Sequence, residues 1–301
     1  MDEEWIVTPP FDFRQMLRRP MSRPSKVTVI DPDTPSYTRV IRLRTRAVPV
    51  TVMGKEGTAG DPTLRLEMPD GLSSGERVEV RERVGRIFST DMPVQGFYSH
   101  MRRYSEWSGL IERLHGLRPI QDADLFESVI KVIIGQQLNV EFAATLVERL
   151  VDFGGETVEW NSRLLPVFPS VERVAGWSYD DLRTLSFSQR KAEYVIDFAR
   201  AVIDARIDLE GLRDMSDGEI AEVLMSLRGI GRWTVECFLL FGMGRRDLMP
   251  AADIGVQNAV QKLYGMERRP KEEEIRQIAE PWAPWRSYAT YYLWQSLIPV
   301  S

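Results

Sequence analysis

Apolar and polar residues alternate along parts of the first ninety positions, with the two-residue period of a half-buried β-strand. The period appears in three segments, Ile41–Ala47, Leu64–Met68 and Arg77–Arg81. Gly, Pro and Asp residues typical of turns occupy the stretches 31–35 and 53–62. We therefore predict a set of antiparallel strands with one solvated face in this part of the chain.

From about residue 89 the apolar positions follow a helical period instead. Residues that cap helix N-termini precede the apolar runs, and glycines follow them. The predicted caps are Asp124 with Glu127, Asn139, Ser188, and Ser216 with Glu219, and the predicted stops are Gly135, Gly154-Gly155 and Gly265. The chain is thus expected to be α+β, with a β-rich N-terminal domain over residues 1–90 and an all-helical body over residues 91–301.

Composition narrows the class of protein. The chain has 301 residues, 43% of them hydrophobic and 28% charged, which is typical of a globular protein. Its single cysteine, Cys237, and its two histidines argue against a disulfide, a zinc site or an iron–sulfur cluster within one chain. The N-terminus is acidic and no apolar run reaches the roughly 20 residues of a membrane span. We therefore expect a cytoplasmic protein with no membrane partner.

A tight turn joins two predicted helices after position 227. Gly229-Ile230-Gly231 would let the backbone reverse, bury Ile230 and direct free amides outward at the start of the second helix. Such amides, with the helix dipole, form an anion site. The formal net charge of -5 argues against a diffuse basic surface but leaves room for this local site. Taken alone, the turn is more simply explained as a helix corner without a ligand.

A carboxylate, Asp253, follows the second helix of this pair. It lies in the segment Leu248-Met249-Pro250-Ala251-Ala252-Asp253, directly before a further helix. The simplest interpretation is that Asp253 caps this helix. A catalytic role is compatible with that position, and Asp247 is the alternative carboxylate, although its context indicates a surface turn.

These motifs together resemble the helix-hairpin-helix DNA glycosylases, in particular the 3-methyladenine DNA glycosylase II type. The resemblance covers nearly the whole chain, and several separated motifs in the right order make it specific. Besides the turn and Asp253, the matching segments are Pro9–Phe13, Ile133–Gln137, Leu185–Ala192 and Pro284–Ala289.

The resemblance implies a role for each residue of the site. Asp253 would be the catalytic carboxylate that stabilises positive charge on the sugar while the base departs. Trp233 and Trp294 would line the base pocket and attract a positively charged alkylated purine, although Trp294 could equally be a core residue. Cys237 stands where a pocket tyrosine is expected, so the pocket would be more open.

DNA would be held by the hairpin. The residues implied in this contact are Gly229, Ile230, Gly231, Arg232 and Thr234. Either Gln137 or Leu138 would fill the gap left by the flipped nucleotide, or Gln137 simply bonds to its own backbone. The arginines that alternate along 41–47 are expected on the solvated face of the sheet, with contact to DNA phosphates as the alternative.

No organic cofactor is implied, and no side chains suggest a metal site. The family's hairpin can bind a cation such as Na⁺ or Mg²⁺ through backbone carbonyls, here those of Met225, Leu227 and Ile230.

The function implied is a monomeric, monofunctional DNA glycosylase. It would flip alkylated purines such as 3-methyladenine or 7-methylguanine out of double-stranded DNA and leave an abasic site. Trp233 stands where bifunctional relatives have a lysine nucleophile, and an indole forms no Schiff base. The alternatives are a non-catalytic DNA-damage binder and a glycosylase for deaminated or oxidised purines.

Overall fold

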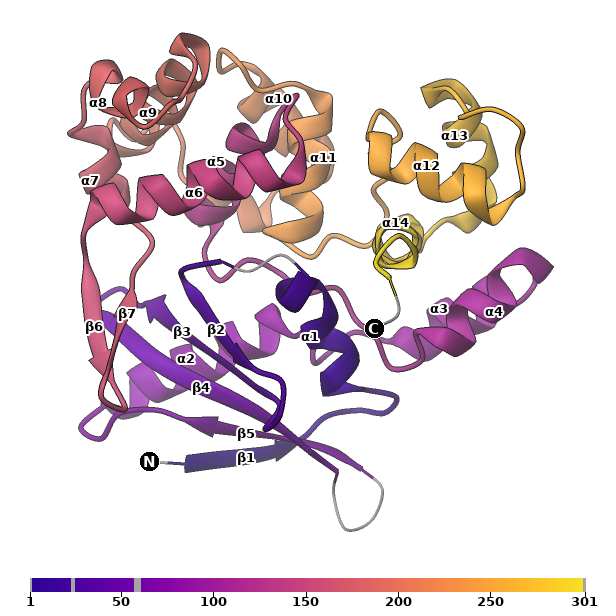
Figure 1. Ribbon diagram of the computed structural model, residues 1–301, viewed down its shortest axis with the longest axis horizontal. Coiled ribbons are helices and arrows are strands. Elements are labelled where there is room, and N and C mark those ends of the chain that lie inside the picture. The colour runs from indigo at the N-terminus through magenta and orange to yellow at the C-terminus, as the bar shows by residue number, and fades with distance from the viewer. Residues whose placement is uncertain (1, 23–24, 57–60, 300–301) are drawn as a thin grey trace.

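The computed structural model describes residues 2–22, 25–56 and 61–299. Its N-terminal part is a five-stranded antiparallel sheet with the strand order β1-β5-β4-β3-β2 (Figure 1). The strands are β1 (Asp2–Ile6), β2 (Thr28–Asp31), β3 (Ser36–Arg42), β4 (Ala47–Glu56) and β5 (Pro62–Glu67). The predicted antiparallel sheet is therefore confirmed, and the predicted turn at 31–35 joins β2 to β3. The predicted turn at 53–62 is wrong at its start, since β4 continues to Glu56, and its residues 57–60 lie outside the described residues.

Two strand predictions need correction. Arg77–Arg81 lies in helix α2 (Ser74–Ile87), because Ser73 and Glu76 form a capping box that starts a helix. Its buried residues Val80, Val84 and Ile87 follow a helical spacing, which outweighs the short alternation. The Ile41–Ala47 segment is two strand ends joined by a turn, in which Leu43 N donates to Arg46 O at 2.8 Å.

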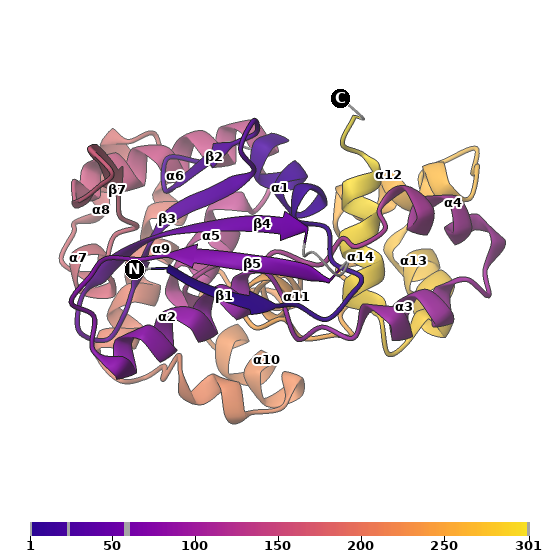
Figure 2. The same ribbon diagram turned by 90° about the horizontal axis from the view of Figure 1, so that it is seen from below.

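A helix that the sequence pattern did not predict, α1 (Phe13–Ser22), follows β1 and packs on the sheet. Phe13, Met16 and Leu17 form its buried face. Figure 2 shows α1 beside the C-terminal helix α14 (Arg286–Ser296), at the edge of the sheet. A residue on the exposed side of α1 can therefore reach the helical part of the molecule.

The helical part lies on one side of this sheet and beyond one end of it (Figures 1 and 2). Its remaining helices are α3 (Val94–Met101), α4 (Ser105–Arg113), α5 (Leu125–Gly135), α6 (Val140–Gly154), α7 (Val171–Ala175), α8 (Tyr179–Thr184), α9 (Gln189–Ile203), α10 (Asp217–Met225), α11 (Arg232–Phe241), α12 (Ile254–Leu263) and α13 (Glu272–Ala279), with short 3-10 turns at Gly211–Asp214 and Glu280–Trp282. A hairpin of β6 (Thr157–Trp160) and β7 (Arg163–Pro166) interrupts them and packs against β4 and β3. No helix among the described residues combines the length and apolar character needed to cross a membrane.

Two main hydrophobic cores organise these elements. One combines the sheet and α1–α4 with α12–α14, and the other is built from α5–α11. Figure 1 shows α3, α4 and α12–α14 gathered at one end of the molecule, beside α10 and α11. The division of the chain at residue 90 stays a prediction, since the first core takes residues from both sides of it.

The predicted helix starts are mostly confirmed: Asn139, Ser188 and Ser216 each accept from an amide of the following turn. Asp124 caps α5, but Glu127 does not complete the predicted capping box. Its carboxylate instead binds Arg39 of β3 at 2.7 Å, and both side chains are at most 4% exposed. Glu127 does not complete the capping box because the buried Arg39 needs a counter-charge.

We expect this buried ion pair to be essential to how α5 packs on the sheet. Arg39→Met removes the nearer of two cations that contact Glu127, at 2.7 Å against 3.5 Å for Lys131, so it should lower the free energy of unfolding by about 3 kcal/mol. The double variant Arg39→Met/Glu127→Met should recover most of that loss, measured by urea denaturation. If the double variant is as unstable as the single one, uncompensated charge is not the cause.

Candidate active site

The predicted hairpin is present between α10 and α11. Gly229 has a φ of +89°, and a Cβ there would lie 2.3 Å from the ring of Tyr194, so both backbone and space demand glycine. Ile230 is buried in the α5–α11 core, as predicted. Gly231 is extended, and a Cβ on it would meet nothing within 4 Å. The fold itself thus requires only the first of the two glycines.

Helix α11 begins at Arg232 without a side-chain cap. Its first amides therefore have no intrahelical acceptor and are directed outward from the hairpin. The Thr234 side chain is buried and accepts from Gln136 Nε2 at 2.8 Å, while the same amide group also donates to Gly229 O at 2.8 Å. Gln136, which the sequence analysis did not single out, therefore supports the hairpin, and only the backbone of Thr234 remains for DNA.

Between α5 and α6, the chain turns at Gln136 and Gln137. Gln137 is exposed with a φ of +56°, whereas Leu138 is half-buried against the α5–α11 core. Lys191 of α9 donates from Nζ to the carbonyls of Ile133 and Gln136 at 3.0 and 2.8 Å. This geometry projects Gln137 rather than Leu138 from the surface.

Asp253 is the N-cap of α12, and its carboxylate is held by three donors. Val256 N and Trp294 Nε1 donate to Oδ1, both at 2.9 Å, and Trp233 Nε1 donates to Oδ2 at 3.3 Å. The capping interpretation is confirmed, and the cap brings Asp253 together with both predicted tryptophans. Gly255 makes this possible, because a Cβ there would lie 2.9 Å from Asp253 Oδ1 and 3.1 Å from Trp294 Nε1.

The wall of this site is one face of α11 against α14. Trp233, Cys237 and Phe241 are four residues apart and so share that face. Phe241 stacks on Trp294 with ring centroids 5.2 Å apart. Trp294 is 8% exposed and belongs to the first core, so its core role is confirmed alongside its contact with Asp253. The four-residue spacing from Trp233 was the signal that could have revealed Phe241.

Cys237 is buried, and burial raises the pKa of its thiol well above the ordinary value, with a further increase from the charge of Asp253. Arg19 of α1 opposes this shift, so both charges act on the thiol. The thiol is therefore protonated at neutral pH and cannot serve as a nucleophile. It lies on the same face of α11 as Trp233, and its place in a base pocket stays a prediction.

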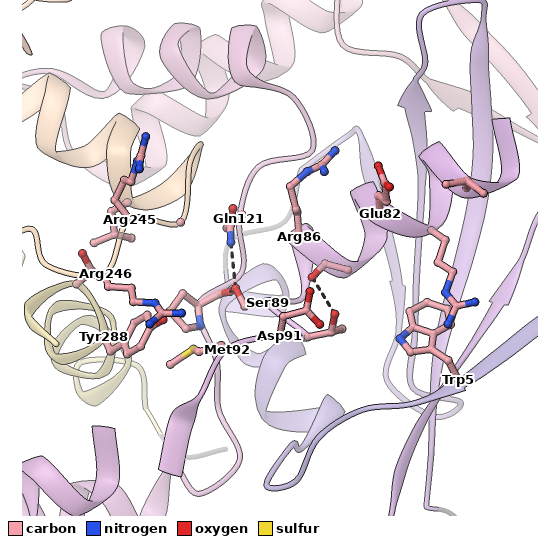
Figure 3. A pocket seen from close by; sticks show the side chains of 18 residues that line it. Trp5, Glu82, Arg86, Ser89, Asp91, Met92, Gln121, Arg245, Arg246 and Tyr288 are labelled. Atoms are coloured by element: carbon pink, nitrogen blue, oxygen red, sulfur yellow. Dashed lines mark hydrogen bonds between the residues drawn. The ribbon is translucent and has the colours of Figure 1, made fainter. Parts of the chain in front are cut away.

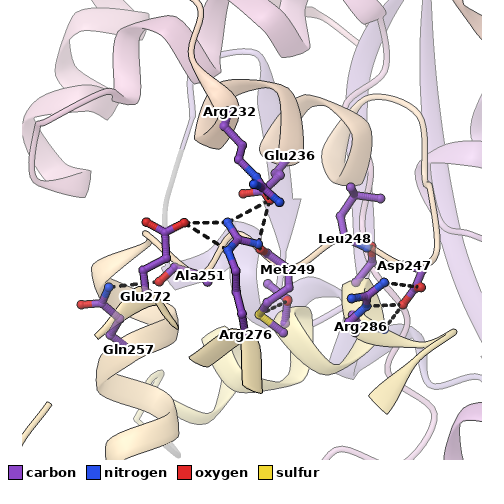
Figure 4. Close-up of polar contacts among 12 residues, drawn as sticks. Arg232, Glu236, Asp247, Leu248, Met249, Ala251, Gln257, Glu272, Arg276 and Arg286 are labelled. Carbon is purple, nitrogen blue, oxygen red and sulfur yellow. Dashed lines mark hydrogen bonds and ion pairs between the residues drawn. The ribbon is translucent and has the colours of Figure 1, made fainter. Parts of the chain in front are cut away.

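The loop that carries Asp253 is tied to the neighbouring helices (Figure 4). Gln257 Nε2 donates to Ala251 O at 3.0 Å, and Arg276 Nη1 donates to Met249 O at 3.3 Å. Arg276 also binds Glu236, which binds the exposed side chain of Arg232 at 3.1 Å. Burial raises the pKa of Glu236, although both arginines oppose that shift.

Asp247, the alternative carboxylate, is bound by Arg286 through both oxygens at 2.7 and 2.6 Å (Figure 4). Burial tends to raise its pKa, but the hydrogen bonds from Arg286 outweigh it and leave the pKa lowered. Asp247 thus anchors the loop to the start of α14; it lies in a bend, as predicted, but is half-buried rather than on the surface.

The predicted cation site involves the carbonyls of Met225, Leu227 and Ile230. Leu227 O accepts from Ile230 N at 3.2 Å and retains a second lone pair, so the hairpin is compatible with a cation. The cation stays a prediction.

A separate cavity of about 610 Å³ lies between α2, the end of α11 and the start of α14 (Figure 3). Arg81, Arg86, Arg245 and Arg246 are among its lining residues, and none of the predicted site residues is. The candidate active site is therefore defined by the contacts of Asp253 and not by this cavity.

Residues 130–284 match the HhH-GPD superfamily of base excision DNA repair proteins. This segment contains the hairpin and Asp253. The chain belongs to this superfamily. The predicted helix-hairpin-helix glycosylase family, its α+β fold and its enzyme class are thereby confirmed.

Relatives extend the likeness over the whole chain. The Bacillus subtilis protein YfjP, whose name assigns it provisionally to the DNA-3-methyladenine glycosylases, is 35% identical and covers 98% of this chain and 99% of its own. The 3-methyladenine DNA glycosylase of Archaeoglobus fulgidus superposes with a TM-score of 0.85 at 26% identity, over 99% of this chain and 100% of its own. The Schizosaccharomyces pombe 3-methyladenine DNA glycosylase, solved with abasic DNA, has a TM-score of 0.58 at 27% identity, over 68% of this chain and 100% of its own.

The buried lysine near the hairpin gives a pH-dependent prediction. Burial lowers the pKa of Lys191 from 10.5 to about 8. Between pH 8 and pH 10.5, Lys191 has released its proton in the folded protein but still binds it in the unfolded chain. The free energy of unfolding therefore rises with pH across this range. Lys191→Met leaves two carbonyls without their donor, so it should be less stable than wild type at pH 7, and the gap should widen from pH 8 to 10.5.

Thermal unfolding of both proteins across this pH range measures the gap. Lys262→Met, which removes an exposed helical lysine, is the matched control and should show little change. A gap that narrows as the pH rises would mean that the charged ammonium is the form the fold requires.

Proposed function

We propose that the protein is a monofunctional DNA glycosylase that hydrolyses the N-glycosidic bond of alkylated purines in double-stranded DNA. The observation that carries this proposal is the half-buried carboxylate of Asp253, held by two indole N–H groups and the amide of Val256 at the start of α12. Those donors and the helix dipole stabilise a negative charge there. The relatives named as 3-methyladenine DNA glycosylases support the choice of lesion.

Asp253 would act by electrostatic stabilisation of the transition state. When the bond between the sugar carbon C1′ and the base nitrogen breaks, both electrons leave with the base and positive charge develops on the deoxyribose. A fixed carboxylate facing that sugar lowers the energy of this state. Water then adds to C1′, its proton is taken up by the carboxylate or solvent, and an abasic site remains.

The hairpin would hold the DNA strand. Since a side chain at Gly231 would meet nothing within the protein, the position is open to close approach by a phosphate, next to the uncapped amides of α11. The exposed Gln137 would enter the gap left by the flipped nucleotide, and Arg232, with its side chain 69% exposed, would lie near the backbone. We propose that the protein acts as a monomer in the cytoplasm.

The contacts of Trp233 and Lys191 support the monofunctional assignment. Trp233 occupies the position of the lysine in bifunctional relatives and is engaged with Asp253. Lys191 has a lowered pKa, but its Nζ is directed at two backbone carbonyls within the protein and is only 9% exposed. It is therefore placed for support rather than for attack on a sugar.

We expect Asp253→Asn to reduce the release of 3-methyladenine from methylated duplex DNA by at least about a hundredfold, because the amide carries no negative charge. Released bases are measured by chromatography, and binding to abasic duplex DNA should be kept. Asp247→Asn is the matched control: it weakens an ion pair and should lower stability while base release persists. Near-normal release by Asp253→Asn would refute the catalytic assignment.

Strand cleavage tests the monofunctional proposal. Duplex DNA with one 7-methylguanine should yield intact strands after incubation with the protein and should be nicked only on later treatment with alkali. Borohydride should trap no covalent protein–DNA adduct, because Trp233 cannot form a Schiff base and Lys191 Nζ is directed at two backbone carbonyls. A trapped adduct that disappears in Lys191→Met would assign lyase activity to that residue.

A further inference from the structure

Arg19 reaches the candidate active site from the N-terminal part of the chain. It lies on α1, whose apolar face packs on the sheet. Its guanidinium carbon lies 4.9 Å from the ring centre of Phe241, 5.5 Å from that of Trp294 and 5.8 Å from that of Tyr291. Both ribbon views place α1 next to α14 (Figures 1 and 2). The Arg19 guanidinium thus lies against the aromatic wall of the site. This wall includes Trp294, which donates a hydrogen bond to Asp253.

One nitrogen of this guanidinium lacks an acceptor among the described residues. Nη1 of Arg19 is buried and has no hydrogen-bond partner within the part of the chain that the structure describes. A buried donor without an acceptor is unfavourable, and native proteins rarely keep one without a reason. An acceptor supplied by a ligand would satisfy it.

The position of Arg19 also changes the charge of the site. The electron-rich faces of Phe241 and Trp294 would otherwise attract a cation. Here Arg19 already supplies that cation. A second positive charge on a flipped base would be repelled by the guanidinium, because both would sit in a poorly solvated site. Trp294 contacts both charges, because its Nε1 donates to Asp253 and its ring lies under the Arg19 guanidinium.

We propose that Arg19 determines substrate specificity, by disfavouring positively charged bases and donating from Nη1 to an acceptor on a neutral purine such as the 6-oxo group of hypoxanthine. This inference rests on the proposed function, since it concerns the base that enters the same site. It modifies the expectation that the tryptophans select for cationic bases: alkylated bases leave easily, but Arg19 shifts recognition toward neutral ones with an oxygen or nitrogen acceptor.

The test compares two lesions in the same duplex sequence, 7-methylguanine, which is a cation, and hypoxanthine, which is neutral. For Arg19→Gln, kcat/KM for hypoxanthine release should fall by about ten- to hundredfold, since a charged donor is lost. For 7-methylguanine it should rise, because the charge that repels the cationic base is removed. Comparing each variant with wild type on each lesion cancels the difference between the two leaving groups.

Two further variants separate charge from structure. Arg19→Lys keeps the charge, so 7-methylguanine release should not rise, whereas hypoxanthine release should fall because the fork of donors is lost. Arg14→Gln removes a positive charge from an exposed position of the same helix and should change neither rate. Melting temperatures of all variants report on folding.

An equal change in both rates, no change in either, or no rise for 7-methylguanine in a folded Arg19→Gln protein would overturn the specificity role. If wild-type protein releases neither base while binding the DNA, the proposed function itself fails. The two failures are therefore distinguishable, because only the second is visible without any variant.

Discussion

The site depends on the convergence of three N–H groups on one carboxylate. Trp233 comes from α11, Trp294 from α14 and the amide of Val256 from α12. The hydrogen bonds of Asp253 therefore depend on the relative positions of these three helices. Gly255 keeps the space between the indole and the carboxylate free. Because hydrogen bonds weaken steeply with distance and angle, a small shift of any one helix would release the charge from its partners.

Two hydrophobic cores meet at this point. Trp294 belongs to the core shared by the sheet and the C-terminal helices, whereas Val235 and Phe238 anchor α11 in the other core. The site therefore lies at the boundary between the two cores, with the hairpin on the side of the α5–α11 core and Asp253 on the side of the other core. The sheet does more than support this arrangement, since α1, which packs on it, contributes Arg19 to the aromatic wall.

An acidic protein can still be suited to DNA if its positive potential is local. Several arginines near the site are neutralised by carboxylates, as in the Arg232, Glu236 and Arg276 cluster. The uncapped amides of α11 carry a partial positive charge that no carboxylate side chain cancels through a cap. The net charge of -5 therefore says little about this surface.

Features set by neighbouring residues were recognised from the amino-acid order alone. Helix caps at Asn139, Ser188 and Ser216, the turn at Gly229 and the cap of α12 by Asp253 each act over a few positions, so they can be predicted without a fold. The resemblance to a family added the catalytic assignment of Asp253 and the tryptophans.

Contacts between distant segments needed the folded chain. Glu127 binds Arg39, 88 positions away, instead of the predicted capping partner. Arg19 contacts Phe241 from α1, a helix that the pattern of the first ninety residues did not predict. Burial decides such cases: a charge or an aromatic ring removed from water must find its partner in space, and spacing along the chain carries no information about that partner.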